Sequence, residues 1–183
     1  ASAKSDRVFS KYMTRRDAVY AAVKGYEERS DQMAVLIGHA SIDENGTIQG
    51  RKPGDQTTKE ICIREWYSKP WNVYLECLDD NLANRAAAIM EEICKNDNFG
   101  YSQPNRWKGF NAIVNNGRKV AGAKGDFDCS SLVLACYILA GLSIAASVYT
   151  GNMKSILLAT GKFKAYTDAA HTGSSAYAKR GGI

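Results

Sequence analysis

The spacing of apolar residues predicts short strands in the first half of the chain. Residues 33–37 form an apolar run that is typical of a buried strand and that ends at a Gly-His pair. From Trp71 to Cys77, apolar and polar residues alternate as they do in a strand with one buried face. The string Asp-Glu-Asn-Gly at 43–46 is a strong turn signal. We therefore expect residues 33–77 to supply strands of an antiparallel sheet.

Apolar residues recur at helical spacing in four further segments. The predicted helices cover about residues 15–29, 82–93, 129–140 and 151–160. The first follows the capping-box string Thr-Arg-Arg-Asp, and the last ends at Gly161, a residue type that often closes helices. Residues 105–126 hold several glycines and basic residues and are predicted to be a loop-rich connection.

The helix predicted at 129–140 begins with an unusual arrangement. Asp128 has the residue type of an N-cap, so Cys129 becomes the first helical residue. Unpaired backbone N–H groups and the positive end of the helix dipole favour the thiolate form there. Cys136 lies deeper, where an ordinary core cysteine is expected. Spacing alone leaves Cys129 as either a reactive thiol or a plain helix start.

Three stretches of the chain resemble known cell-wall enzymes. The segment GDFDCSSLVLACYILAG is similar to the cysteine-bearing helix of the NlpC-type papain-like peptidases. NDNFGYSQ falls where that family carries an active-site tyrosine, which points to Tyr101, although a buried tyrosine at a helix end fits equally well. The opening GHASIDENGTIQGRKPGDQTTKEICIREWYSKPW and the later YTGNMKSILLATGKFKAYTD resemble a phage and prophage branch of endolysin-like peptidoglycan amidohydrolases of Gram-positive hosts.

The resemblance covers about residues 33–183 and implies both a fold and a chemistry. The fold would be α+β and papain-like, with a central antiparallel sheet against the apolar face of the cysteine helix. Residues 1–32 would be an added N-terminal helical extension. The implied reaction is acyl transfer through a thioester on Cys129, with helix-start N–H groups holding the oxyanion. Tyr101, Asp128 and Ser130 would bind the substrate.

The proton acceptor is the difficult part of the implied mechanism. In the family the base histidine follows a Lys-Arg-Gly-Asp-Ile segment. YAKRGGI matches that segment at the end of this sequence, so we expect the C-terminal strands to be incomplete. His39 lies in a Gly-His string that mimics the family's histidine strand, whereas His171 lies in a polar loop. Either the usual base is absent from this chain, or the site is rewired around a histidine that it holds, and we name His39 as the candidate base to test. Asp55 would orient it or contact substrate, or would simply be a turn aspartate.

Two functions follow from this interpretation. The first is a cysteine peptidase or amidase that cleaves peptidoglycan stem peptides, and the second is a wall-binding or structural phage protein that keeps the fold without the chemistry. Muramoyl-alanine amidases and stem-peptide endopeptidases share this nucleophile, so the cleaved bond stays open. The protein would be made in the host cytoplasm and, once released or secreted, would act at the cell wall.

Composition narrows the partners. The 183 residues carry a net charge of +5, which suits an anionic wall polymer but is too scattered to indicate nucleic acid. The five cysteines include no Cys-x-x-Cys pair, so neither zinc nor another metal is expected. No phosphate-binding loop points to a cofactor. The longest apolar run, 132–142, is too short to cross a bilayer, and the oligomeric state stays open.

Overall fold

The computed structural model describes residues 34–41, 52–67, 69, 71–145 and 147–183. Residues 35–183 form one compact unit. The predicted extension at 1–32 with its helix, and the predicted turn at 43–46, lie outside the described residues.

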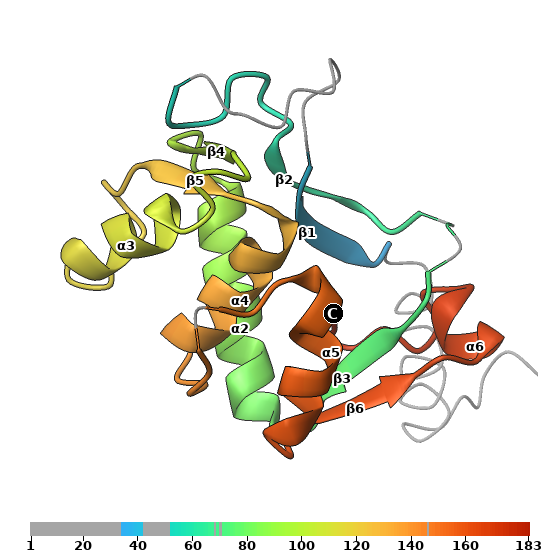
Figure 1. Ribbon diagram of the computed structural model, residues 1–183. Helices are drawn as coiled ribbons and strands as arrows, with labels where there is room; N and C mark the ends of the chain where they lie inside the picture. Colours follow the sequence, from blue (N-terminus) through green and yellow to red (C-terminus); the bar gives the residue numbers. More distant parts are fainter. Residues whose placement is uncertain (1–33, 42–51, 68, 70, 146) are drawn as a thin grey trace, which may run out of the picture. The chain divides into compact units, whose positions relative to one another are not determined.

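Among the described residues, six strands pair two by two into three small sheets (Figure 1). Two pairs are antiparallel, namely β1 (Leu36–Ala40) with β2 (Ile61–Glu65) and β3 (Tyr74–Cys77) with β6 (Phe163–Tyr166). The third pair is parallel and joins β4 (Phe99–Tyr101) to β5 (Gly125–Phe127). The fold is therefore α+β, but the prediction of one central antiparallel sheet is wrong for the described residues.

In the described part of the chain, five helices accompany these sheets. They are α2 (Asp80–Cys94), α3 (Lys108–Asn115), α4 (Cys129–Leu139), α5 (Thr150–Ala159) and α6 (Ala169–Thr172). The predicted helices at 82–93, 129–140 and 151–160 are confirmed as α2, α4 and α5. Gly161, just beyond the C-cap of α5, has φ +68, so its lack of a side chain suits the end of that helix.

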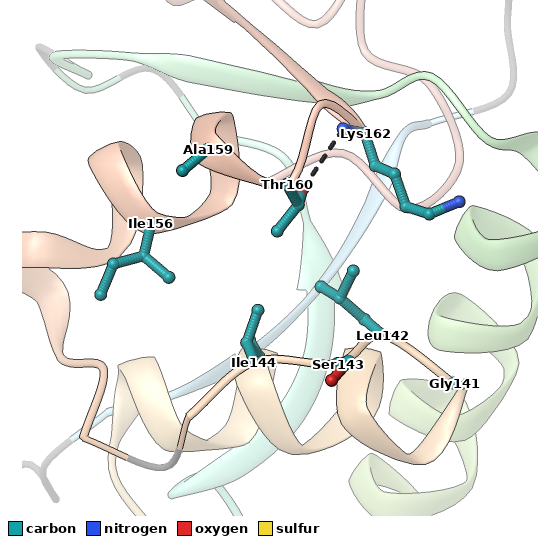
Figure 2. A pocket seen from close by; sticks show the side chains of 8 residues that line it. All are labelled: Gly141, Leu142, Ser143, Ile144, Ile156, Ala159, Thr160 and Lys162. Atoms are coloured by element: carbon teal, nitrogen blue, oxygen red, sulfur yellow. Dashed lines mark hydrogen bonds between the residues drawn. The ribbon is translucent and has the colours of Figure 1, made fainter.

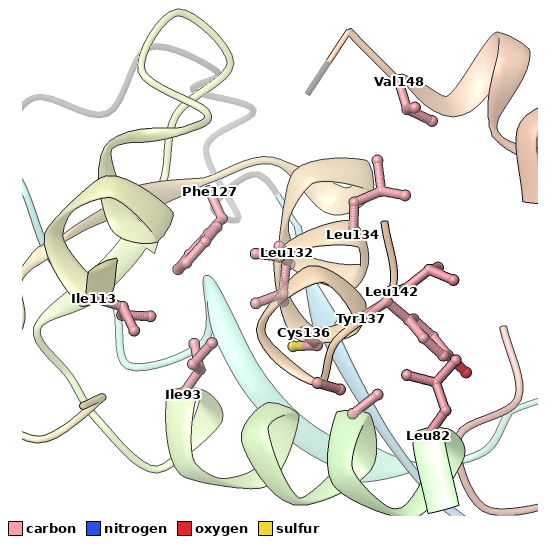
Figure 3. Packing of buried hydrophobic residues seen from close by; sticks show 14 of the residues in the cluster. Leu82, Ile93, Ile113, Phe127, Leu132, Leu134, Cys136, Tyr137, Leu142 and Val148 are labelled. Atoms are coloured by element: carbon pink, nitrogen blue, oxygen red, sulfur yellow. The ribbon is translucent and has the colours of Figure 1, made fainter. Parts of the chain in front are cut away.

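Helices α2 and α4 lie side by side and hold the core between them (Figure 3). Ile93 on α2 and Leu132 on α4 are both fully buried, as is Phe127 at the end of β5. Burial on α4 is not confined to one face. Most of the helix surface is covered, because Leu134, Ala135 and Tyr137 are buried in addition to Leu132. Cys129, at the first position of the helix, is exposed.

Two predicted segments need correction. The strand predicted at 33–37 lies instead at Leu36–Ala40, because its register is set by pairing with β2. The segment predicted as a loop at 105–126 contains α3 and the start of β5. Two of its glycines, Gly109 and Gly125, are packing residues: a Cβ at Gly125 would lie 2.6 Å from the Gly109 nitrogen, so only glycine lets α3 approach β5 this closely. Gly117 and Gly122 have positive φ and lie in turns.

Candidate active site

The start of α4 is fixed by a reciprocal cap. The Asp128 side chain accepts a hydrogen bond from the Ser131 backbone N–H at 2.7 Å, and the Ser131 hydroxyl accepts one from the Asp128 N–H at 2.9 Å. The buried Ser130 hydroxyl donates to the same carboxylate at 3.1 Å. Cys129 is therefore held as the first helical residue with its side chain exposed, which confirms the predicted placement.

Thr150 is a polar neighbour of the Cys129 sulfur. Its Oγ1 lies 3.7 Å from Sγ, at the first position of α5. At that distance a sulfur atom still makes a weak hydrogen bond, and either atom can donate. The beginnings of α4 and α5 therefore meet at the thiol, and sequence analysis did not single out this threonine.

Tyr101 lies on the same side of the fold as Cys129. It ends β4, where it pairs in register with Phe127, two residues before Cys129. The buried Glu60 carboxylate accepts a 2.7 Å hydrogen bond from the Tyr101 backbone N–H and so fixes this strand end. Burial raises the pKa of the Tyr101 phenol, and the nearby acidic groups of Cys129 and Asp128 add to that shift.

Arg106 links the parts of this region and was also missed by sequence analysis. Its Nη2 donates to the Ser130 hydroxyl at 2.7 Å and to the Val148 carbonyl at 3.1 Å. Its Nε lies 3.0 Å from Asp128 Oδ2, although the N–H is not aligned with the oxygen, so this contact is an ion pair without a well-directed hydrogen bond. A lone arginine in a predicted loop gives no sequence signal of such a role.

His39 lies in β1 opposite Cys62 of β2. Its Nε2 is 3.4 Å from the Cys62 sulfur. Burial, and then the positive charge of Arg64, lower the pKa of the His39 imidazole, while burial raises the pKa of the Cys62 thiol. Both shifts favour a neutral pair over a thiolate–imidazolium pair. Within the described residues, no hydrogen bond joins His39 to Cys129.

Asp55 organises the loop before β2. Its two carboxylate oxygens accept hydrogen bonds from the backbone N–H groups of Thr57, Lys59, Glu60 and Ile61, at 2.9 to 3.3 Å. This is the geometry of an aspartate that holds a turn. In the described part of the chain it makes no hydrogen bond to the His39 ring.

His171 is engaged elsewhere. Its Nδ1 lies 2.7 and 2.8 Å from the two oxygens of Asp168. Its ring stacks on Tyr166 with centroids 4.0 Å apart and packs at a tilt against Tyr177 at 4.6 Å. The hydrogen bond from His171 lowers the pKa of the Asp168 carboxyl. Both histidines of the chain therefore have partners other than Cys129.

The structure thus brings Tyr101, Asp128, Cys129 and Ser130 together and leaves His39 and Asp55 with other contacts.

A separate apolar hollow of about 530 Å³ lies between the loop after α4 and the second half of α5 (Figure 2). Its lining, which includes Leu142, Ile144 and Ile156, contains none of the candidate residues.

Two further features bear on metals and membranes. Within the described part of the chain, no three side chains of the metal-binding types are grouped so that they could hold an ion. No helix among the described residues is both long enough and apolar enough to span a bilayer.

Comparison with known proteins gives one match. The family model described as an endolysin-like domain matches residues 37–183, which is most of the chain and includes the whole Cys129 region. Searches of curated proteins and of solved structures return no match. The chain belongs to the endolysin-like domain family.

Proposed function

We propose that this protein is a peptidoglycan hydrolase that cleaves an amide bond of cell-wall stem peptides through a thioester on Cys129. Family membership supports a cell-wall lytic role, since endolysins are lytic enzymes. The observation that carries the assignment is the exposed Cys129 side chain at the first position of a capped helix. The resemblance to papain-like cysteine peptidases supports the same chemistry.

The proposed reaction uses groups at the start of α4. The Cys129 thiolate attacks the amide carbon, and the carbonyl oxygen becomes an oxyanion. Within the described residues the backbone N–H groups of Cys129 and Ser130 have no hydrogen-bond acceptor, so both are free to stabilise that charge. The amine leaves with a proton, and water then hydrolyses the thioester to a carboxylate and the free thiol.

The proton acceptor in this proposal is His39. The lowered pKa of its imidazole keeps the ring neutral near pH 7, as a general base requires. To act on Cys129, the ring must exchange its contact with the Cys62 sulfur for one with the nucleophile or with a bridging water. Asp55 would then orient the base or contact the substrate.

The proposed substrate contacts lie beside the nucleophile. Tyr101 would line the site beside Cys129, although the residue is buried, so a substrate would meet only the small exposed part of it. Asp128 and Ser130 are buried, so they shape the site mainly through the helix start. The partner would be peptidoglycan at the bacterial cell wall, cut at either the muramoyl-alanine bond or a bond within the stem peptide.

A second function is favoured by one observation. His39 contacts Cys62 and His171 contacts Asp168, so neither histidine hydrogen-bonds to Cys129 in the described structure. A protein that binds wall material without cutting it would show this arrangement. Without a positioned base, a cysteine peptidase loses about 10²- to 10⁴-fold in rate.

Lysis of purified cell walls separates the two functions. The native protein should clear a wall suspension, and Cys129→Ala should not. Cys77→Ala is the matched control, since it removes a thiol at the end of β3 and should keep lysis once folding is verified. His39→Ala, measured alongside, should lose activity as completely as Cys129→Ala. Wall binding without lysis by the native protein would support the second function.

A further inference from the structure

The Arg106 guanidinium contacts three residues around Cys129. It contacts Asp128 just before α4, Ser130 inside its first turn, and the Val148 carbonyl just before α5. Val148 is fully buried and lies two residues before Thr150, whose hydroxyl is the polar neighbour of the Cys129 sulfur. One side chain therefore fixes the start of α5 against the start of α4.

The charge of Arg106 has a separate effect. Asp128 caps the helix but places a negative charge one residue from the thiol, which opposes formation of a thiolate. Arg106 Nε lies 3.0 Å from that carboxylate, and the side chains of Arg106 and Asp128 are only 23% and 11% exposed. Solvent screening is weak for a pair this buried, so the arginine offsets most of the field of the aspartate.

We propose that Arg106 is a positioning residue for Cys129, acting by neutralising the Asp128 cap and by docking Val148 so that Thr150 lies beside the sulfur. This inference rests on the proposed role of Cys129 as nucleophile. The proposal adds Arg106, a positively charged residue outside the Asp-Cys-Ser string, to the groups that act on Cys129 at the start of α4. Arginine suits the task because its Nη2 donates to both a hydroxyl and a carbonyl while its Nε lies 3.0 Å from the carboxylate.

The electrostatic part is tested by the pH dependence of Cys129 alkylation with iodoacetamide, followed by peptide mapping. Arg106→Gln should move the midpoint of the pH–rate profile to higher pH and slow the reaction at pH 7 about three- to tenfold. Asp128→Asn keeps an N-cap residue and should move the midpoint the other way. The double variant should return close to the native profile. Such opposite, cancelling shifts would not come from a loss of packing.

The docking part is tested by amide hydrogen exchange in a peptide covering residues 147–153. Arg106→Gln and Arg106→Lys should both speed exchange there, because lysine keeps the charge but has one nitrogen in place of the Nη2 that donates to Val148 and Ser130 and the Nε that lies beside Asp128. Arg106→Lys should nevertheless keep the native alkylation midpoint. Arg85→Gln is the matched control, because Arg85 donates to the Ala140 carbonyl just past the far end of α4, and it should change neither readout.

These measurements do not require wall hydrolysis, so the two proposals fail separately. If the native protein does not lyse cell walls, the proposed function is contradicted. The alkylation and hydrogen-exchange results would still test the role of Arg106. The positioning role is overturned if folded Arg106→Gln keeps the native alkylation midpoint, if Asp128→Asn shifts it in the same direction, or if exchange at 147–153 is unchanged.

Discussion

The hydroxyl of Thr150 lies 3.7 Å from the Cys129 sulfur, across 21 residues of sequence. It is positioned to donate a hydrogen bond to a thiolate, and such bonds to charged groups are stronger than those between neutral groups. Thr150→Val keeps the shape and removes the hydroxyl, so alkylation of Cys129 at pH 7 should slow about three- to tenfold, the value of a weak charged hydrogen bond. Thr150→Ser should react at nearly the native rate. Equal rates in Val and Ser variants would show that the hydroxyl contributes nothing.

The five thiols should differ in reactivity near neutral pH. Cys129 is exposed, whereas burial raises the pKa of Cys94 to about 12 and raises the pKa values of Cys62 and Cys136. Cys77 is buried. Brief iodoacetamide treatment should therefore label Cys129 first, as peptide mapping would show. Preferential labelling of Cys62 would mean that its contact with His39 activates that thiol instead.

Gly109 should resist the substitution that usually strengthens helices. Alanine in place of a helical glycine gains about 1 kcal/mol from helix propensity. Here an added Cβ would lie 2.3 Å from the Phe127 ring, which is fully buried, so Gly109→Ala should lower the free energy of unfolding by about 1–3 kcal/mol from overpacking. Urea denaturation measures this change.

Gly151→Ala is the matched control for that measurement. Its Cβ would meet the ring of Tyr149 at 2.6 Å, but that ring belongs to an exposed side chain that can move aside. Its effect should be neutral or stabilising. A stabilising Gly109→Ala would show that α3 does not press on Phe127 in solution.

His39 should make the protein sensitive to acid. Because its pKa in the folded protein lies below the ordinary histidine value of 6.5, the unfolded chain takes up the proton more readily. The contribution of His39 to the free energy of unfolding should be fully present above pH 6.5. It should fall as the pH drops towards the pKa of His39 in the folded protein. The fall is smaller than the one-proton limit of about 1.4 kcal/mol per pH unit, since a half-buried ring is partly screened.

Urea denaturation between about pH 7 and pH 5 measures this dependence. His39→Asn should flatten it, and His171→Asn should keep the fall because His39 is still present. A native-like slope in His39→Asn would assign the acid sensitivity to another group.

Local signals in the sequence were sufficient to place Cys129 at the start of its helix. The Asp-Cys-Ser-Ser string ahead of an apolar run predicts both the cap and the first helical residue, because capping depends on residues three positions apart. The same holds for α2 and for the end of α5 at Gly161. These features were confirmed.

Relationships between distant segments could not be predicted in this way. Arg106 reaches Val148 only because the loop after β4 passes the start of α5, and no residue near Arg106 signals that. The division into three small sheets depends on long-range pairing, and the Gly109–Gly125 approach has the same sequence signature as a flexible loop. The assignment of His39 as base stays a prediction for the same reason.

The proposed function depends most directly on a covalent thioester between Cys129 and a wall-derived acyl group. Native protein mixed with purified cell walls and quenched in acid should yield a Cys129 peptide whose mass has increased by a stem-peptide or muropeptide fragment, together with released muropeptides that carry a new amine end. The fragment would also identify the bond that is cut. Release of muropeptides by folded Cys129→Ala at the native rate, or release by the native protein with no adduct on Cys129 under any quench time, would contradict this mechanism.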